Sequence, residues 1–324
     1  MRKPTFWFLA ACGSVFPTHA WAHHDTAVQQ VGSTTTDVGS TDFEGDGPRF
    51  EARAGFTWQS FGRLQSGGDR FDDAKPAVAV ERYTLSMSYR MASRTRIDLA
   101  LPAGRIRGER AGAMGLGDVS AGLSQAFGPV RVGLLGTAPT GRYTMDAVSS
   151  VVDVTADDSG TPRLTTYDAR ASLGSGTWQV GTVASLEGRL GRFGGQLRTT
   201  LIQPLNETVD GIRWGRDVTL LAAASARLAG DQIQLGTGLL GRIHAADRIQ
   251  AEPEPERTAE VLRTSRRRSL GIVTSLGIRL TGGLSCGTRA HVPLAQWVQG
   301  VQLAESFTVT ASCALAREWS QASS

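Results

Sequence analysis

Apolar and polar residues alternate in one segment after another along this chain, and that alternation restricts the fold more than any other feature. In the first such segment Phe50, Phe56 and Trp58 lie at even positions, whereas Glu51 and Arg53 lie at odd positions. A period of two residues places apolar side chains on one face of a β-strand and polar ones on the other. No segment shows a competing helical stripe, so the sequence predicts an all-β fold.

We predict twelve strands from this pattern. The links between them alternate in length, from the short Gly128-Pro129 to the long stretch 140–176. Short turns at one end and longer loops at the other, on an even number of strands, are typical of a membrane-spanning barrel. A soluble β-sandwich, the alternative, has no reason to place every long loop at one end. The predicted strands are residues 49–61, 78–90, 94–103, 118–127, 130–139, 177–189, 194–203, 217–228, 232–243, 268–280, 283–293 and 305–315.

The strand lengths suit a single transmembrane up-and-down antiparallel β-barrel. A tilted strand needs about 9–11 residues to cross the hydrocarbon layer. A closed barrel also pairs every backbone amide with a neighbouring strand, which lipid requires. Beyond the N-terminal segment no apolar run reaches the roughly 18 residues of a membrane helix. Membrane lipid is therefore the first expected partner.

The N-terminus is interpreted as a cleaved signal peptide. Arg2 and Lys3 form its basic start, an apolar segment follows, and Ala20 and Ala22 supply the small residues read at cleavage. The alternative makes Cys12 a lipid-modified cysteine. Export predicts the outer membrane of a Gram-negative bacterium. The expected parts are a signal peptide, a flexible periplasmic arm or lumen plug, the barrel and a C-terminal tail, at residues 1–22, 23–47, 48–318 and 319–324.

The glycine-rich stretch GLGDVSAGLSQAF, residues 115–127, raises the question of a nucleotide-binding loop. In a dinucleotide-binding fingerprint the third glycine would fall at Ser120, and a helix would follow. Val119, Ala121 and Leu123 instead alternate with polar or small residues, and no Lys-Ser or Lys-Thr pair indicates a phosphate loop. We interpret Gly115 to Gly117 as the end of an outer loop, after which a strand begins.

That stretch resembles the phenol-degradation meta-pathway family of outer-membrane barrels, as do three further motifs in the same order. They are APTGRY, LGSGTWQVG and GVQLAESFTVTASCAL, at residues 138–143, 173–181 and 300–315. The resemblance implies a barrel that passes small hydrophobic or aromatic compounds, and it supplies no catalytic residue. One departure is the ending AREWSQASS, because many such barrels end on an aromatic residue.

No enzymatic, cofactor or metal site is expected. The segment GLSCG, residues 283–287, matches the G-x-S-x-G motif of hydrolases, but no helical pattern follows it. Ser285 and His291 share a strand face, yet six strand residues separate them by roughly 20 Å. His23, His24 and Asp25 are Cu(II) ligands by type, and incidental histidines in an unstructured terminus are the simpler interpretation.

Two cysteines, Cys286 and Cys313, follow the predicted signal peptide and fall on the apolar faces of the last two strands. Their hairpin pairing makes a cross-strand disulfide feasible in an oxidising compartment. Two separate lipid-facing thiols are the alternative, and the role is structural in either case.

Arginines dominate the polar faces of the predicted strands. In a narrow lumen this excess favours anions such as an aromatic carboxylate. The alternative places five of them, Arg90, Arg131, Arg189, Arg227 and Arg279, at a solvated periplasmic rim. Net charge is only +4, so no nucleic-acid partner is expected, and a small solute is. The expected lumen residues are Arg53, Arg82, Arg96, Arg198 and Arg289 with Glu51 and Asp98.

Overall fold

The computed structural model describes residues 49–67, 69–71, 78–91, 94–108, 112–143, 147–156, 162–170, 172–209, 211–229, 232–249 and 266–318. The predicted signal peptide, arm and C-terminal tail lie outside the described residues, as do Cys12 and His23 to Asp25. The long strands are β1 (Arg49–Gly67), β3 (Val78–Met91), β4 (Thr95–Arg107), β6 (Val119–Phe127), β7 (Val130–Ala138), β10 (Gln179–Leu190), β11 (Phe193–Pro204), β13 (Asp217–Leu228), β14 (Ile233–His244), β16 (Arg267–Arg279) and β17 (Leu284–Glu318).

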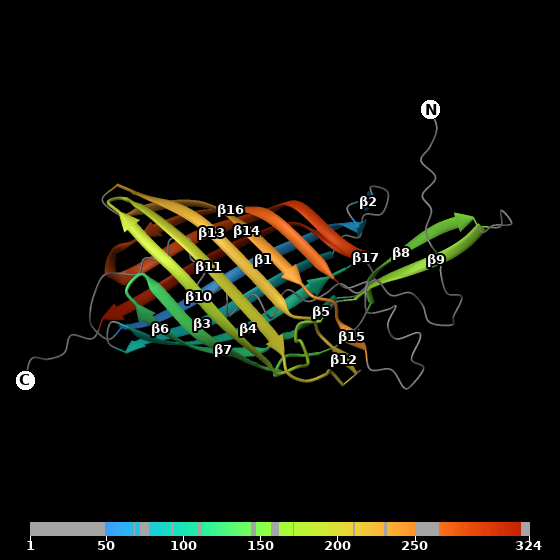
Figure 1. Cartoon of the computed structure of the whole chain (residues 1–324), viewed down its shortest axis with the longest axis horizontal. Helices are drawn as coiled ribbons and strands as arrows, with labels where there is room; N and C mark the ends of the chain where they lie inside the picture. Colours follow the sequence, from blue (N-terminus) through green and yellow to red (C-terminus); the bar gives the residue numbers. More distant parts are fainter. Residues whose placement is uncertain are drawn as a thin grey trace, which may run out of the picture.

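The strand β17 runs through both sides of a hairpin, which raises the number of barrel strands to twelve. Its first limb, residues 284–298, pairs with β16. Its second limb, residues 301–318, pairs with β1, so that Arg49 lies opposite Glu318. This last pairing closes an antiparallel barrel in which each strand neighbours the next in sequence (Figure 1). The predicted fold is confirmed.

Short and long connections gather at opposite ends of the barrel. The tight turns, such as the one at Gly128-Pro129, lie at the end where the second limb of β17 finishes, on the left of Figure 1. We call this the turn end and the other the loop end. The connection between η2 (Thr281–Gly283), a single 3-10 turn, and β17 is also at the turn end. Among the described residues no helix is long and apolar enough to cross a membrane.

The loop end contains more regular structure than the sequence indicates. The stretch 140–176 was expected to be a link without strands of its own, and this expectation is wrong in part, because it holds a two-stranded ribbon that extends beyond the barrel (Figure 1). The ladder of such a ribbon is made by backbone N–H and C=O groups, so a polar composition does not prevent the pairing. The additional strands are β2 (Asp69–Phe71), β5 (Gly112–Leu116), β8 (Ala147–Ala156), β9 (Pro162–Arg170), β12 (Ile212–Arg213) and β15 (Arg248–Ile249).

The outer surface of the barrel is apolar and exposed. Leu134 is 64% exposed and Phe193 55%, and exposed leucine, valine, phenylalanine or tyrosine residues recur at every second position of the strands. Aromatic rings contact each other there, with Trp58 and Phe307 meeting edge to face at 4.8 Å between centroids. Contiguous exposed apolar surface on this scale is unfavourable in water.

Candidate functional site

The seven charged residues predicted to line the lumen lie on the inward strand faces. Tyr83 on the outer surface is 53% exposed, whereas the preceding Arg82 is 8% exposed. Since the barrel is closed, the strand face opposite the exposed apolar residues is the inner one. The residues that share this face are Glu51, Arg53, Arg82, Arg96, Asp98, Arg198 and Arg289.

Two of these arginines are paired with an acid on the same strand. Nη2 of Arg53 lies 2.8 Å from Oε1 of Glu51, and Nε of Arg96 lies 2.7 Å from Oδ1 of Asp98. Residues i and i+2 of a strand share a face, so both pairs line the lumen. The positive charge of the inner wall is therefore lower than the arginines alone indicate.

A cavity in the inner wall lies near the turn end, where β4, β6, β7, β10 and β11 are neighbours. Arg96 and Arg198 line it together with Arg131, which the sequence placed near the periplasmic rim. Arg198 is only 5% exposed. This cavity gathers three guanidinium groups from three strands in one place.

A second polar group of the inner wall, which we call the Glu305 cluster, joins β14 to both limbs of β17. The carboxylate of Glu305 lies 3.2 Å from Nη1 of Arg242 and 2.9 Å from Nδ1 of His291. Thr308 donates a hydrogen bond to the same carboxylate. Glu305 is 6% exposed and His291 4%. A buried carboxylate needs such partners, because removing its charge from water is costly.

The sequence did not single out Glu305, because strict alternation through Phe307 and Val309 would place it on the outer surface. The pairing of β1 with β17 shifts at this point: Ser60 is opposite Phe307, and Phe61 is opposite Glu305. Ser306 is thus an extra residue, and its hydroxyl accepts a hydrogen bond from the backbone N–H of Gly62 at 3.1 Å. A bulge of this kind re-aims the next side chain, here toward the lumen.

A second bulge, in the first limb of the same hairpin, also turns a side chain toward the lumen. In the pairing of β16 with β17, Gly271 is opposite Pro293 and Leu270 is opposite Ala295, so Leu294 is extra. The shift turns Gln296 inward, where its amide donates to the carbonyl of Glu305 at 2.6 Å and accepts from the N–H of Glu305 at 3.2 Å. Both bulges therefore contribute to the Glu305 cluster.

At the loop end, three of the sequence motifs meet at Asp118. Oδ1 of Asp118 accepts a hydrogen bond from the N–H of Gly141 at 2.9 Å. Oδ2 accepts from both the N–H and the hydroxyl of Ser175, each at 2.6 Å. Asp118 is 1% exposed and Ser175 3%. The motifs GLGD, APTGRY and LGSGTW are thus parts of one structure, which we call the Asp118 seat.

Glycines are required where these segments touch. A Cβ atom on Gly141 would lie 2.6 Å from the backbone carbon of Gly117, and one on Gly174 would lie 2.8 Å from that of Gly141. Neither distance accommodates a side chain. The neighbouring Leu173 reaches the inner wall, because a Cβ on Gly104 of β4 would lie 2.9 Å from its Cδ2. The segment 172–178 is therefore packed within the mouth of the barrel.

Next to the seat lies a histidine held between two acids. Nδ1 of His244 is 2.8 Å from Asp217, and its Nε2 is 2.8 Å from Asp247. Asp247 also accepts the N–H of Gly215 at 2.6 Å. Trp214 donates its indole N–H to the carbonyl of Ser175 at 2.7 Å. These bonds connect the loop after β11 to the Asp118 seat.

Among the described residues, Ser285 of the G-x-S-x-G match and His291 lie apart along the first limb of β17. Ser285 is paired with Arg279 of β16. His291 is paired with Val273, six residues earlier in that strand. The Nδ1 of His291 is engaged by Glu305 rather than by a serine. Within the described ranges no three His, Cys, Asp or Glu residues are grouped so that they hold a metal ion.

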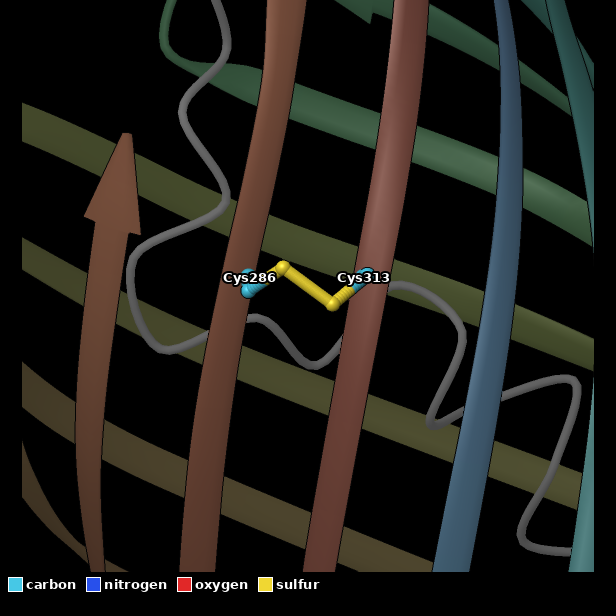
Figure 2. Close-up of a disulfide and its surroundings, with 2 residues drawn as sticks. All are labelled: Cys286 and Cys313. Carbon is cyan, nitrogen blue, oxygen red and sulfur yellow. A yellow bond between two sulfur atoms is a disulfide. The ribbon is translucent and has the colours of Figure 1, made fainter. Parts of the chain in front are cut away.

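A disulfide joins the two limbs of β17 on the outer surface (Figure 2). The bond connects Cys286 to Cys313, whose Cα atoms are 4.0 Å apart and which are 27 residues apart in sequence. Cys313 is opposite Ala54 of β1, so the bond lies at the last hairpin, beside the closing strand pair.

Comparisons with known proteins bear on the fold. No protein-family model and no curated protein matches the sequence. An outer-membrane channel from Pseudomonas putida F1 superposes with a TM-score of 0.66 at 15% identity, covering 87% of this chain and 99% of that one. At such identity the similarity shows a shared barrel fold alone.

Two other solved structures are less similar. The translocator domain of the autotransporter NalP from Neisseria meningitidis has a TM-score of 0.42 at 14% identity, covering 89% of this chain and 95% of that one. A mutant of the monoaromatic hydrocarbon channel TodX has a TM-score of 0.40 at 8% identity, covering 93% and 96%.

Proposed function

We propose that this protein is an outer-membrane channel of a Gram-negative bacterium for the passive uptake of small hydrophobic or aromatic solutes, including anionic ones. The observation that carries the proposal is the closed barrel of twelve strands, apolar outside and polar inside. The apolar side chains of such a barrel face outward. A lipid bilayer is the environment in which an apolar outer surface of this kind is stable.

The inner wall supports a solute path rather than a solid core. Interior side chains of a barrel of twelve strands need not fill it. Arginines lie along that wall on several strands, and Arg53 and Arg96 are each paired with an acid of the same strand. A wall of this character favours anions over cations.

The Asp118 seat supports a restriction to small solutes. It holds the segment 172–178 inside the mouth by buried hydrogen bonds to backbone and side chain. The resemblance of the motifs that form the seat to the phenol-degradation family agrees with a path for small aromatic compounds. The P. putida structure, which shares the fold, is described as an outer-membrane channel.

The test is the reversal potential of the purified, folded protein in a planar bilayer across a KCl gradient. We expect a potential of the sign for anion flow. A triple variant with Arg96→Gln, Arg198→Gln and Arg289→Gln should lose that selectivity. The control is Arg107→Gln, because Arg107 is on the outer surface with its side chain 54% exposed and bridges Glu81 there.

Two results would contradict the proposal. Cation selectivity in the wild-type protein would remove the role of the arginines. Absence of any conductance, from protein shown to be inserted and folded, would favour a structural or assembly-related barrel that does not conduct.

A further inference from the structure

The cavity near the turn end combines charged and apolar lining in a small space. Its volume is about 50 Å³, which accommodates a group of a few non-hydrogen atoms and not a whole sugar. Its polar lining comes from Arg96, Arg131 and Arg198 with Asp98, Glu187, Ser124 and Ser185.

The two acids of the cavity are each engaged by a named partner. Asp98 is paired with Arg96 at 2.7 Å. Glu187 accepts hydrogen bonds from Gln196 at 3.1 Å and from Ser185 at 3.3 Å. Among the described lining residues there are three guanidinium groups and two carboxylates, one positive charge more than negative. The cavity is therefore electrostatically suited to one further anion.

Arg131 is the arginine best placed to receive that anion. Its contact is a hydrogen bond from Nη1 to the hydroxyl of Ser124, at a long 3.5 Å. Within the part of the chain that the structure describes, no carboxylate lies within 4.0 Å of its guanidinium. A planar guanidinium offers two parallel N–H donors to one carboxylate, which an ammonium group does not.

The remaining lining is apolar and kept open by glycine. Leu135 on β7 and Val183 on β10 face inward beside Gly122 and Gly133. A Cβ atom on Gly122 would lie 3.2 Å from Cδ2 of Leu135, so a larger residue would occupy the floor of the cavity. A ligand here meets guanidinium on one side and hydrocarbon on the other.

We propose that this cavity is a binding subsite for the carboxylate of a small aromatic acid. Arg131 and Arg198 hold the carboxylate, and Leu135 and Val183 contact the adjoining ring, most of which lies in the lumen. The subsite rests on the proposed function and deepens it, because it names aromatic carboxylates as the anionic solutes. Its position near the turn end makes it the last contact before release.

The experiment is isothermal titration of the folded wild-type protein in detergent micelles with benzoate, benzyl alcohol and acetate. We expect benzoate to bind most tightly, because only benzoate offers both a carboxylate and a ring. Arg131→Gln should weaken benzoate binding by about tenfold or more, the loss expected for one charge-assisted hydrogen bond. Val183→Thr keeps the side-chain shape and should weaken benzoate while leaving acetate unchanged.

Arg279→Gln is the matched control. Arg279 is the last residue of β16, at the same end of the barrel, and does not line the cavity. We expect it to bind benzoate as the wild type does. Equal weakening by Arg131→Gln and Arg279→Gln would overturn the subsite in favour of a general field. Wild-type affinity in Arg131→Gln, or acetate binding as tight as benzoate, would overturn it as well.

The titration separates this proposal from the proposed function. Binding is measured without a membrane, so a barrel that does not conduct can still bind benzoate at the subsite. A conducting barrel without benzoate binding would remove the subsite and leave the channel.

Discussion

Nδ1 of His291, on the first limb of β17, lies 2.9 Å from Oε1 of Glu305 on the second limb. The two residues face each other inside the barrel because the bulge at Ser306 turns Glu305 toward the lumen, the face on which His291 already lies. The hairpin that completes the barrel is thus joined on its inner face by buried polar groups and on its outer face by the disulfide.

Glu305→Ala should destabilise the barrel more than Glu305→Gln. Alanine leaves the half-buried guanidinium of Arg242 and the buried ring of His291 without their carboxylate, and breaking a buried pair costs about 3–5 kcal/mol. Glutamine keeps an acceptor for Arg242 and His291 and should cost less. The measurement is the urea dependence of unfolding in lipid vesicles. Equal midpoints for the two variants would contradict the role assigned to the carboxylate.

Loss of the disulfide should lower stability without changing the fold. The bond closes a loop of 27 residues, for which chain entropy predicts a contribution of about 2–4 kcal/mol. Mass spectrometry of the unreduced protein should first detect the peptide pair that contains Cys286 and Cys313. Cys286→Ala/Cys313→Ala should then unfold at a lower urea concentration than the wild type, and a reducing agent should shift the wild type alone.

Asp118→Ala should widen the mouth of the barrel. It removes the acceptor for the N–H of Gly141 and for both donors of Ser175, so the segment 172–178 loses its attachment. We expect a larger single-channel conductance. Thr140→Ala is the control, because Thr140 accepts the neighbouring N–H of Val119 at an exposed position. An unchanged conductance in Asp118→Ala would show that the seat does not limit the path.

Gly141→Ala should also give a larger single-channel conductance, here through a steric clash rather than through lost hydrogen bonds. Its added methyl group overlaps the backbone of Gly117 and Asp118 at 2.6–2.8 Å, and rigid backbone cannot yield as a side-chain tip does. Gly136→Ala on β7 is the matched control, since nothing lies within 4 Å of its Cβ position. Conductance and heat stability should change in the first variant and not in the second.

The barrel itself could be predicted from sequence because its two-residue period is local. Alternation in a segment such as 78–90 fixes which face is apolar, and the alternating link lengths fix the two ends. The Glu305 cluster could not be predicted this way, because a bulge breaks the period at Ser306 and no residue type marks it. The pairing of strands across the hairpin is needed to find it.

The Asp118 seat likewise combines a feature that a local sequence pattern predicts with contacts that it does not predict. The motif GLGD was interpreted as the end of a loop followed by a strand from Asp118, and this is wrong in part, because Gly115 and Leu116 end the strand β5 and β6 begins at Val119. Its contact with Ser175 spans 57 residues and depends on how three loops fold back, which no local period reports. The ribbon of β8 and β9 was missed for a related reason: its composition is that of a loop, and only its pairing makes it a strand pair.

The pairing of Arg49 with Glu318 joins the first strand to the last, across nearly the whole described chain. Contacts this distant in sequence form slowly, since the intervening chain must first lose its freedom. Until then the N-terminal and C-terminal strands each have an unpaired edge, which invites pairing with other chains. A chain that lacks its last strand therefore cannot close this barrel, and both of its edges stay open to other chains.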